Sequence, residues 1–352
     1  MPAAAPSSAP PAPHAPPSAS AATPVAPAFV PDRVIGEGRA MGTHIKMVGF
    51  TQPNMSVAKV QGAFAAALGE IKRIEDVMTT WRPEAELARL NAAEGKTAVQ
   101  VSPETLELVQ TSIRTSEASE GTFDITFETL HGLWKFDQDL DPHPPAKADI
   151  QKLLPFVGYK HIQVDTAAQT IKLGTPRTRI SLGGIAKGYA VDRAAKVLDD
   201  AGLRAYFVQA GGDLFARGTK PDGTGWQAGV RDPRGPDGSF FALLSLTDHA
   251  FSTAGDYERS YITSGKRYHH IIDPRTGEPA TASRSVTVWA KSALVADALD
   301  DAIFILGPDK GLRLVEQTPE AGCVIVDKNN TVWVSDRLKP VLGIVRRPSD
   351  GI

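Results

Sequence analysis

The sequence predicts an α+β fold in which mixed or antiparallel sheets are flanked by helices. Past residue 147, short stretches of alternating apolar and polar residues, such as HIQVD, TIKLG and SVTVWA, follow one another between Gly, Asp and Pro turns. This spacing is typical of antiparallel hairpins, because a tight turn joins strands that run in opposite directions. Apolar residues at the three- and four-residue spacing of a helix occur in only a few long stretches, and these do not alternate regularly with strands. A doubly wound parallel sheet needs that alternation and is therefore not expected.

The first residues differ from the rest of the 352-residue chain. Residues 1–31 are dominated by Pro, Ala and Ser, and Asp32 is the first residue with a formally charged side chain. Such a stretch cannot bury enough apolar surface to fold, so we expect a disordered tether. One domain then spans residues 32–345, with a tail at 346–352. Pro/Ala leaders often follow an export signal or lipid anchor, and we expect that a targeting segment was removed.

Composition narrows the classes of partner. The formal net charge of −2 gives no electrostatic reason to bind nucleic acid or an anionic membrane, so a membrane would be reached only through a lost anchor. Small molecules and proteins are the expected partners. The single cysteine, Cys323, lies in the apolar run AGCVIV, which indicates a buried structural thiol and excludes an intrachain disulfide or a cysteine metal site. This cysteine usage suits an oxidising compartment.

In the first half of the chain, the sequence predicts a strand, helices and a loop. The strand is expected around residues 39–50 and a short helix near Asn91, with another helix at about 103–119. Asp137–Lys147, with three prolines, indicates a loop. A long helix is expected at about 56–79, because apolar residues recur there every three or four positions: Val57, Val60, Phe64, Leu68, Ile71, Ile74 and Met78.

In the second half, short strands dominate. Two helices interrupt them, at about 184–201 and 292–306, and the stretches GCVIV and TVWVS are expected to complete the sheet. The first of these helices follows Gly183 and Gly184 and carries Lys187 in its first turn. Glycines allow close backbone approach, and free N–H groups at a helix start attract anions, which indicates a phosphate site. The alternative is an ordinary tight turn.

The second helix carries three aspartates, Asp297, Asp300 and Asp301, at spacing i, i+3 and i+4. Their carboxylates share one face and repel one another. They form either a solvated face or an oxygen-ligand site for a hard cation such as Mg²⁺. The helix is otherwise nearly apolar, which favours the cation site, because buried carboxylates without a partner are costly.

Two adjacent histidines, His269 and His270, precede the turn DPRTG. Adjacent residues of a strand face opposite sides, so one of the two can face a site. A neutral imidazole is well suited to take a proton from a hydroxyl group. The alternative is a polar hairpin. Gly211-Gly212-Asp213 and Gly255-Asp256 are weaker signals that fit either a site or a turn.

Together these stretches resemble the ApbE family of FAD:protein FMN transferases. The resemblance covers about residues 39–334 and is carried, in the family's order, by MGT, TTWRPEAELARLN, TFDIT, SLGGIAKGYAVD, QAGGDL, STAGDYER, HHIIDPRTG and VADALDDAIFILG. It implies a Mg²⁺-dependent enzyme that cleaves the pyrophosphate of FAD, attaches FMN to an acceptor threonine and releases AMP. Acceptors in the family are flavoprotein subunits of respiratory and redox complexes, typically modified in the periplasm or at the outer face of the cytoplasmic membrane.

The resemblance also implies roles for individual residues. His270 matches the histidine that activates the acceptor hydroxyl. The metal would be held by the carbonyl of Gly184 and by the side chains of Asp297, Asp300 and Asp301. FAD would be contacted by Met41, Trp81, Thr122, Phe123, Asp124, Ser181, Lys187 and Ile272.

Three positions depart from the family pattern. Ser181 stands where Asp is usual, Asp301 where Thr is usual, and Trp81 where Tyr is frequent. The extra carboxylate of Asp301 either tightens Mg²⁺ binding or shifts the preference toward Ca²⁺ or Mn²⁺. Two alternative functions remain open: an FAD pyrophosphatase that yields FMN and AMP, and a flavin-binding protein without a chemical step.

Overall fold

The computed structural model describes residues 1–4, 29–137 and 139–351. The chain divides into two compact units, Met1–Val30 and Pro31–Ile352. Most of the expected disordered leader lies outside the described residues. Within the described part of the chain, no helix is both long and apolar enough to cross a bilayer.

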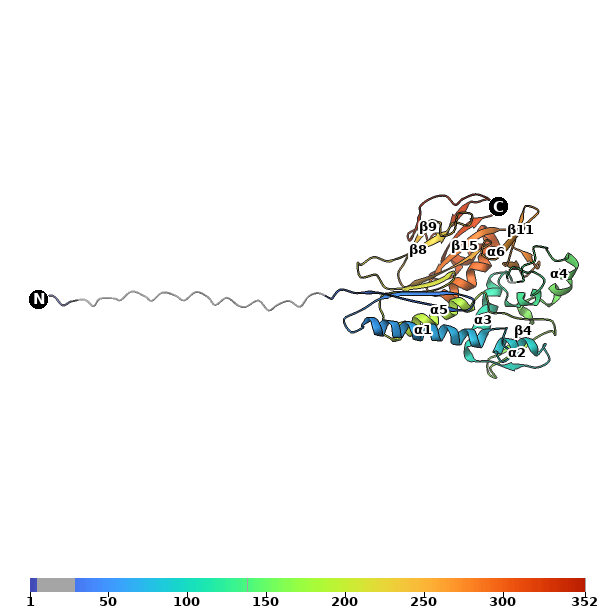
Figure 1. Cartoon of the computed structure of the whole chain (residues 1–352), viewed down its shortest axis with the longest axis horizontal. Helices are drawn as coiled ribbons and strands as arrows, with labels where there is room; N and C mark the ends of the chain where they lie inside the picture. The colour runs from blue at the N-terminus through green and yellow to red at the C-terminus, as the bar shows by residue number, and fades with distance from the viewer. Residues whose placement is uncertain (5–28, 138, 352) are drawn as a thin grey trace. The chain divides into compact units, whose positions relative to one another are not determined.

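The second unit is built on an eight-stranded sheet in the order β1-β2-β6-β7-β10-β15-β16-β17 (Figure 1). Every neighbouring pair is antiparallel, which confirms the predicted α+β class with antiparallel sheets. The strands are β1 (Arg33–Ala40), β2 (Thr43–Phe50), β6 (Tyr206–Ala210), β7 (Asp213–Arg217), β10 (His249–Gly255), β15 (Ser283–Ala290), β16 (Gly322–Asp327) and β17 (Val332–Val334).

Smaller sheets and short helices surround it. One three-stranded sheet joins β8 (Trp226–Arg231), β9 (Phe240–Leu246) and β18 (Leu342–Ile344), and another joins β3 (Val99–Gln100), β5 (Thr170–Leu173) and β4 (Ile162–Asp165). Two-stranded sheets join β11 (Ser260–Thr263) to β12 (Lys266–His269) and β13 (Ile272–Asp273) to β14 (Glu278–Pro279). The 3-10 helices are η1 (Ile125–Leu130), η2 (Leu154–Phe156) and η3 (Tyr159–His161).

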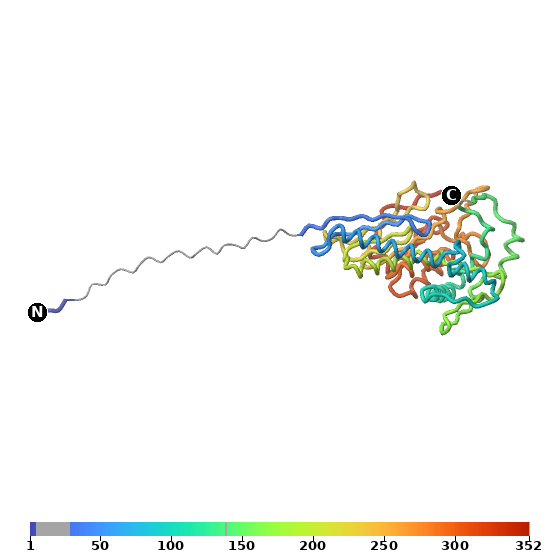
Figure 2. Tube along the Cα trace, turned by 60° about the horizontal axis from the view of Figure 1, so that its bottom comes forward, coloured from blue at the N-terminus to red at the C-terminus, as the bar shows by residue number. Residues whose placement is uncertain are grey.

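The α-helices are α1 (Val57–Met78), α2 (Glu86–Ala92), α3 (Pro103–Ala118), α4 (Lys147–Leu153), α5 (Ala186–Asp200) and α6 (Ala293–Gln317). Helices α5 and α6 pack on the central sheet, and α1 lies against α5 and beside the β1–β2 hairpin (Figure 2). Helix α6 consists of two helical segments separated at Gly307, whose backbone is non-helical, and Pro308. Its first segment therefore ends near residue 306, as predicted.

The central sheet is buried on both faces. In β16, Cys323 and Ile325 pack in the core on the helix side, whereas Val324 and Val326 pack in a second core with residues of β8 and β9. Successive side chains of a strand point to opposite faces, so a strand between two cores is apolar throughout. Cys323 is buried, as the sequence predicted, and burial raises the pKa of its thiol to about 12.

The first strand prediction was incomplete. Residues 33–50 form a hairpin, with Met41 (φ 52°) and Gly42 (φ 70°) at its turn. Positive φ at both turn positions matches the twist of paired strands.

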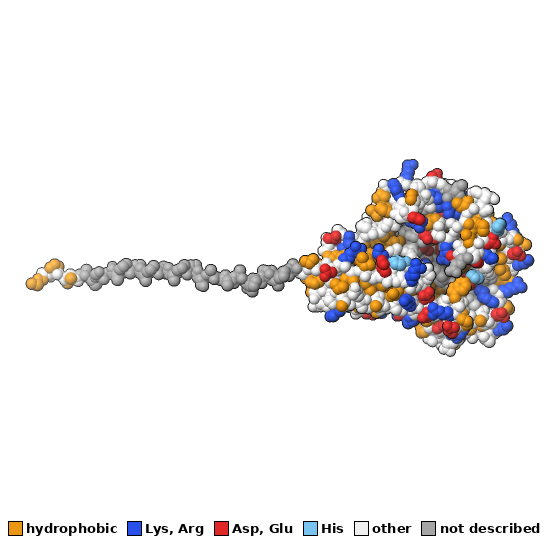
Figure 3. Space-filling view, viewed as in Figure 1, with side chains coloured by type: hydrophobic (Ala, Val, Ile, Leu, Met, Phe, Trp, Pro, Cys, Tyr) orange, Lys and Arg blue, Asp and Glu red, His pale blue; other side chains and the backbone are white. Residues whose placement is uncertain are grey.

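The last residues also differ from the separate tail that the sequence suggested. The N–H and the hydroxyl of Ser349 both donate to the buried carboxylate of Asp232, at 3.0 Å and 2.8 Å, and Arg284 pairs with Asp350 at 3.0 Å. The C-terminal segment is therefore bound to the folded unit. Elsewhere on its surface, charged side chains of both signs are interspersed (Figure 3), in keeping with the low net charge.

Candidate active site

The site is built where α5 crosses α6. Gly188 lies at the crossing, and a Cβ atom there would be 2.6 Å from the carbonyl carbon of Ala293 and 2.7 Å from Cβ of Asp297. The N–H of Gly188 donates to Asp297 Oδ2 at 2.8 Å. Only glycine allows this approach. It brings the first turn of α5 against the helix that carries the three aspartates.

A second contact fixes the start of α6. The carboxylate of Asp192, on α5, accepts hydrogen bonds from the N–H groups of Ala293 (2.8 Å) and Leu294 (2.9 Å). Ser292 adds a local cap, because its hydroxyl accepts from Val295 N at 3.2 Å. These bonds satisfy N–H groups that have no partner within the helix. The spacing between α5 and α6 is therefore set by hydrogen bonds from backbone N–H groups of one helix to aspartate carboxylates of the other.

Lys187 lies between two carboxylates. Its Nζ is 2.6 Å from Asp213 Oδ2 and 3.3 Å from Asp297 Oδ1. Burial works to lower the pKa of Lys187, but the charges of Asp213 and Asp297 outweigh it, so the pKa is raised and the side chain stays an ammonium. Asp213 is fully buried, and its Oδ1 has no hydrogen-bond partner among the described residues. The sequence had indicated a turn or a site at Asp213, without a role.

The other two aspartates complete the cluster. Asp300 Oδ2 accepts from the hydroxyl of Ser252 at 2.6 Å, and its Oδ1 accepts from Asp301 N at 2.6 Å. Gly184 lies beside Asp301, because a Cβ atom on Gly184 would be 3.4 Å from Asp301 Oδ2. Gly184 and the three aspartates of α6 therefore lie in one region. Within the described residues, no group of three or more Asp, Glu, His or Cys side chains is already arranged to hold a metal ion.

The electrostatics of this region are unbalanced. Burial raises the pKa of Asp297 to about 7, with the charge of Asp213 adding to the effect and Lys187 opposing it. Burial and the charge of Asp301 raise the pKa of Asp300 well above its usual range. Burial also raises the pKa of Asp301 to about 6. One ammonium thus faces four carboxylates, an arrangement that favours an added cation.

Part of the predicted flavin set adjoins the cluster. Thr122 donates to the carbonyls of Ser119 (2.9 Å) and Ala302 (3.2 Å), which ties this segment to α6. The ring of Phe123 lies 3.5 Å from the position of a Cβ atom on Gly184. The hydroxyl of Ser181 accepts from Gly183 N at 3.2 Å, in the loop that precedes α5.

Asp124 is a structural centre of the same segment. Its Oδ1 accepts from the N–H and hydroxyl of Thr126, at 2.9 Å and 2.6 Å, and its Oδ2 accepts from Tyr159 N at 2.6 Å. Burial raises the pKa of Asp124 against the opposing effect of these bonds. Both carboxylate oxygens thus already hold the local backbone in place.

The remaining flavin residues lie on other elements. Trp81 follows α1, is 79% exposed, and meets the ring of His131 edge-to-face at 5.7 Å. Met41 is in the β1–β2 turn and packs on the core, and Ile272 pairs with Pro279 in the β13–β14 sheet. Their contacts are separate from the hydrogen bonds of the Lys187 cluster.

The two histidines have different surroundings. His269 is buried, its Nε2 is 2.8 Å from the carbonyl oxygen of Ala280, and its Nδ1 accepts from Ile271 N at 3.3 Å. By contrast, Nδ1 of His270 is buried without a hydrogen-bond partner among the described residues. Burial lowers the pKa of His270 to about 3, and the charge of Arg259 contributes, so the imidazole is neutral at physiological pH.

Arg259 is a further residue of this region that sequence reasoning did not single out. Its carbonyl oxygen accepts from His270 N at 3.1 Å, and its guanidinium pairs with Asp137 at 3.0 Å. Its positive charge also acts to lower the pKa of Asp301. The motif STAGDYER contained Arg259, but the contact to His270 arises from the pairing of β11 with β12.

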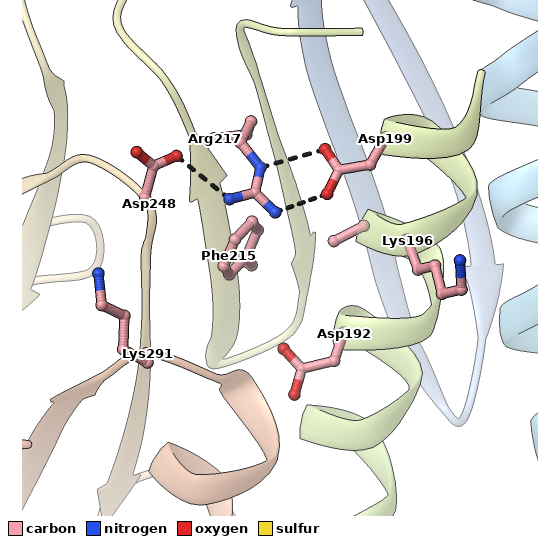
Figure 4. Close-up of a pocket in the computed structure, with 8 residues that line it drawn as sticks. Asp192, Lys196, Asp199, Phe215, Arg217, Asp248 and Lys291 are labelled. Atoms are coloured by element: carbon pink, nitrogen blue, oxygen red, sulfur yellow. Dashed lines mark hydrogen bonds and ion pairs between the residues drawn. The ribbon is translucent and has the colours of Figure 1, made fainter. Parts of the chain in front are cut away.

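A cavity of about 290 Å³ lies elsewhere on α5 (Figure 4). Its charged groups largely satisfy one another: Arg217 bonds to Asp199 through Nε at 3.1 Å and Nη2 at 2.5 Å, and to Asp248 at 3.3 Å. Lys187 and the three aspartates of α6 do not line it. The chemistry is therefore assigned to the Lys187 cluster.

Comparisons with known proteins show the family of this chain. Residues 41–325 match the model of the ApbE family. The FAD:protein FMN transferase of Klebsiella pneumoniae is 30% identical, over 92% of this chain and 93% of that protein, and the one of Escherichia coli K12 is 29% identical, over 87% and 88%. The solved ApbE protein of Thermotoga maritima has a TM-score of 0.79 at 31% identity, covering 88% of this chain and 99% of that one. The flavin transferase ApbE of Vibrio cholerae has a TM-score of 0.79 at 28% identity, covering 89% and 100%. This chain belongs to the ApbE family.

Proposed function

We propose that this protein transfers FMN from FAD to a threonine hydroxyl of an acceptor flavoprotein and releases AMP. The observation that carries the proposal is the contact of Lys187 with Asp213 and Asp297 at the start of α5, beside Gly184. An ammonium, a helix start and a set of carboxylates able to hold a cation are the groups that pyrophosphate cleavage needs. The relatives named FAD:protein FMN transferase support the choice of substrate.

The chain's own groups would bind the pyrophosphate from one side. Gly183 and Gly184 lead into α5, where the N–H of Ala186 donates to the carbonyl oxygen of Leu182 at 2.8 Å and the N–H of Gly188 to Asp297. The helix start therefore contributes through its positive dipole end, and the ammonium supplies the donor. The ammonium of Lys187 has three N–H donors, and two carboxylates surround it, so one donor is left for a phosphate oxygen. Positive charge then lies where negative charge develops on the leaving AMP.

The flavin and adenine would be held by residues from several elements. Trp81 offers an exposed aromatic face for stacking on a flat ring. Phe123 and Ser181 approach the start of α5. Thr122, Asp124, Met41 and Ile272 complete the set that we assign to FAD.

The residues of α6 fit a hard divalent cation. All donors are oxygen atoms, burial raises the pKa values of Asp297, Asp300 and Asp301, and Gly184 lies beside Asp301. Asp297, Asp300, Asp301 and the carbonyl of Gly184 would hold the ion. Mg²⁺ would supply positive charge to the pyrophosphate oxygens, and Ca²⁺ or Mn²⁺ are alternatives because Asp301 adds a carboxylate.

The transfer step balances without an enzyme nucleophile. The acceptor hydroxyl oxygen forms a bond to the phosphorus of the FMN half, the bond from that phosphorus to the bridging oxygen breaks, and AMP leaves with the bond's electron pair. The hydroxyl proton passes to the neutral imidazole of His270. The neutral form is the one that can accept a proton, and the burial and nearby charges that keep it neutral also make it a weaker base than a free imidazole.

We further propose that the acceptor is a flavoprotein subunit of a respiratory or redox complex and that the reaction takes place outside the cytoplasm. A single, fully buried cysteine supports an oxidising location, because the folded protein offers no exposed thiol for oxidation.

The experiment combines the protein with FAD, Mg²⁺ and a purified acceptor subunit that carries an exposed threonine. AMP is measured by chromatography, and attached flavin by fluorescence and mass of the denatured acceptor. We expect equal amounts of AMP and of FMN-labelled acceptor, both abolished by chelation of the metal.

Two results would replace the proposal. FMN and AMP without label on the acceptor would identify a pyrophosphatase, in which water replaces the hydroxyl. FAD that stays bound and intact for hours with Mg²⁺ and acceptor present would identify a flavin-binding protein.

A further inference from the structure

We propose that Asp213 is a positioning residue, which holds the ammonium of Lys187 in place and so leaves the carboxylate of Asp297 for a cation. The inference rests on the proposed function, because the pyrophosphate of FAD is the group that the positioned ammonium would meet. Asp213 itself does not touch the substrate. It acts through Lys187.

The contact distances rank the two partners of Lys187. The ammonium is 2.6 Å from Asp213 Oδ2 but 3.3 Å from Asp297 Oδ1, so Asp213 is the closer partner. The Asp213 side chain is fully buried, whereas 28% of the Lys187 side chain is exposed. Asp213 therefore contacts the ammonium from within the protein.

The backbone gives Asp213 little freedom to move. It is the first residue of β7, paired with Ala210 across a two-residue turn, and the β6–β7 hairpin lies inside the central sheet between β2 and β10. In the turn, Gly211 has φ 59°, and a Cβ atom on it would be 2.8 Å from Thr43 Oγ1. Glycine favours this tight turn and allows the close approach to Thr43, and the pairing on both sides of the hairpin restricts where the Asp213 backbone can lie.

Fold stability does not explain a carboxylate at this position. Its Oδ1 is buried without a hydrogen-bond partner among the described residues. A buried ion pair is often no more stabilising than apolar residues of similar size, and an unsatisfied oxygen makes it less favourable. A role in the site accounts for the charge. Without Asp213, Lys187 would pair with Asp297 alone and neutralise a carboxylate that the cation needs.

The first test needs neither FAD nor turnover. Lysines of the wild type and of Asp213→Asn are acetylated with limiting acetic anhydride at pH 9, and modification of Lys187 is followed by mass spectrometry. An amine held in an ion pair reacts slowly, so loss of the 2.6 Å contact with Asp213 should speed labelling of Lys187. We expect Lys187 to be labelled at least about tenfold faster in Asp213→Asn, the factor that corresponds to about 1.4 kcal/mol of lost interaction with the ammonium.

A matched control and a second variant keep this test decisive. Asp232 is another buried aspartate, which bonds to Ser349 at the C-terminal segment, so Asp232→Asn should leave the labelling of Lys187 unchanged. Equal labelling in wild type and Asp213→Asn would overturn the inference. Should Asp213→Asn fail to fold, Asp297→Asn takes its place: Lys187 should then stay slow because Asp213 still holds it, and a tenfold increase would contradict the proposal.

The second test is a double-mutant cycle on the transfer reaction. We expect Asp213→Asn to lower kcat about 10- to 100-fold in the wild type, but less than about threefold in a Lys187→Gln background, because coupled residues do not act additively. Full additivity would show that Asp213 acts independently of Lys187. If the wild type transfers no FMN, the proposed function fails. The labelling test still shows whether Asp213 holds the ammonium of Lys187, because it needs no transfer reaction.

Discussion

His269 and His270 are neighbours in the chain, yet Nδ1 of His269 accepts a hydrogen bond from Ile271 N, whereas Nδ1 of His270 is buried without a partner among the described residues. A histidine with both nitrogens engaged has a structural role. A buried nitrogen without a partner is available to a hydroxyl group. Replacing His270 should therefore affect the reaction, whereas replacing His269 should affect the stability of the fold.

His270→Ala should slow transfer by about 10²–10⁴-fold, the range typical of a lost acid–base group, and leave FAD binding nearly unchanged. Rates are measured from flavin fluorescence on the acceptor, and binding from quenching of FAD fluorescence. His269→Gln is the matched control. It should lower stability by about 1–3 kcal/mol, because it disturbs buried hydrogen bonds, with kcat retained per folded molecule. The reverse pattern would reject His270 as the base.

Acidification should destabilise the protein through His270. Its pKa is about 3 in the folded state, because of burial and of the charges of Arg259, His269 and Lys187, and about 6.5 when unfolded. Between these values the unfolded chain binds more protons, so stability falls as pH falls below about 6.5. From pH 6.5 to 5 the wild type should lose about 1.6 kcal/mol more than His270→Gln, measured by urea unfolding. Parallel curves for the two proteins would exclude a depressed pKa.

The same pKa changes the expected pH profile of the reaction. An ordinary histidine would lose the base form below pH 6.5. Because His270 stays neutral, its own protonation should cause no drop in transfer rate between pH 7 and pH 5. The rate is measured at saturating FAD and Mg²⁺, because a bound cation keeps Asp297 and Asp301 ionised, whereas without it their pKa values of about 7 and about 6 would add their own titrations. Under these conditions, a single-proton fall centred near pH 6.5 would show that the base titrates as in water.

Asp297→Ala should abolish transfer at millimolar Mg²⁺, because Asp297 bonds to the backbone of α5 and also faces the ammonium of Lys187. Asp301→Thr should be tolerated, since a hydroxyl oxygen remains at that position. Mg²⁺ titrations of activity and of melting temperature separate the two variants. Near-normal activity of Asp297→Ala would contradict the proposal that the three aspartates of α6 hold the cation.

Gly188→Ala should destabilise the protein by about 1–3 kcal/mol or more, because the added methyl group would meet backbone atoms of Ala293 at 2.6 Å. Gly69→Ala is the control. Gly69 lies within α1, and nothing lies within 4 Å of a Cβ atom there, so alanine should stabilise that helix by about 0.5–1 kcal/mol. Urea unfolding of both variants measures the difference. A stable Gly188→Ala with full activity would show that the crossing of α5 and α6 is not tight.

Local periodicity located the helices well. The helix expected at about 56–79 is Val57–Met78, and the one expected at about 103–119 is Pro103–Ala118, because amphipathic spacing, helped at Ser102 by a side-chain cap, defines both. The first strand was missed for a tertiary reason. In β1, Cβ atoms on Gly36 and Gly38 would be 2.7 Å from Phe64 and 2.5 Å from Leu68 of α1. The glycines make room for a helix, whereas in sequence they weaken the strand pattern.

The site was predictable only as separate motifs. The spacing of Asp297, Asp300 and Asp301 showed that they share a face, but not that Ser252 bonds to Asp300. Asp213 lies 26 positions from Lys187, and no local pattern joins them. The sheet order places β7 beside β10 and beneath α5, and that order depends on long-range strand pairing.

The contacts of α5 with α6 have a consequence for slow dynamics. The amide protons of Gly188, Ala293 and Leu294 all lie on hydrogen bonds to aspartate carboxylates that link the two helices. Each amide is exposed to solvent deuterium only when the helices separate, so the three should show one common free energy of opening once their intrinsic exchange rates are taken into account. That free energy would report how often Lys187 and Asp297 lose their relative positions, and a ligand that bridges the helices should raise it for all three together.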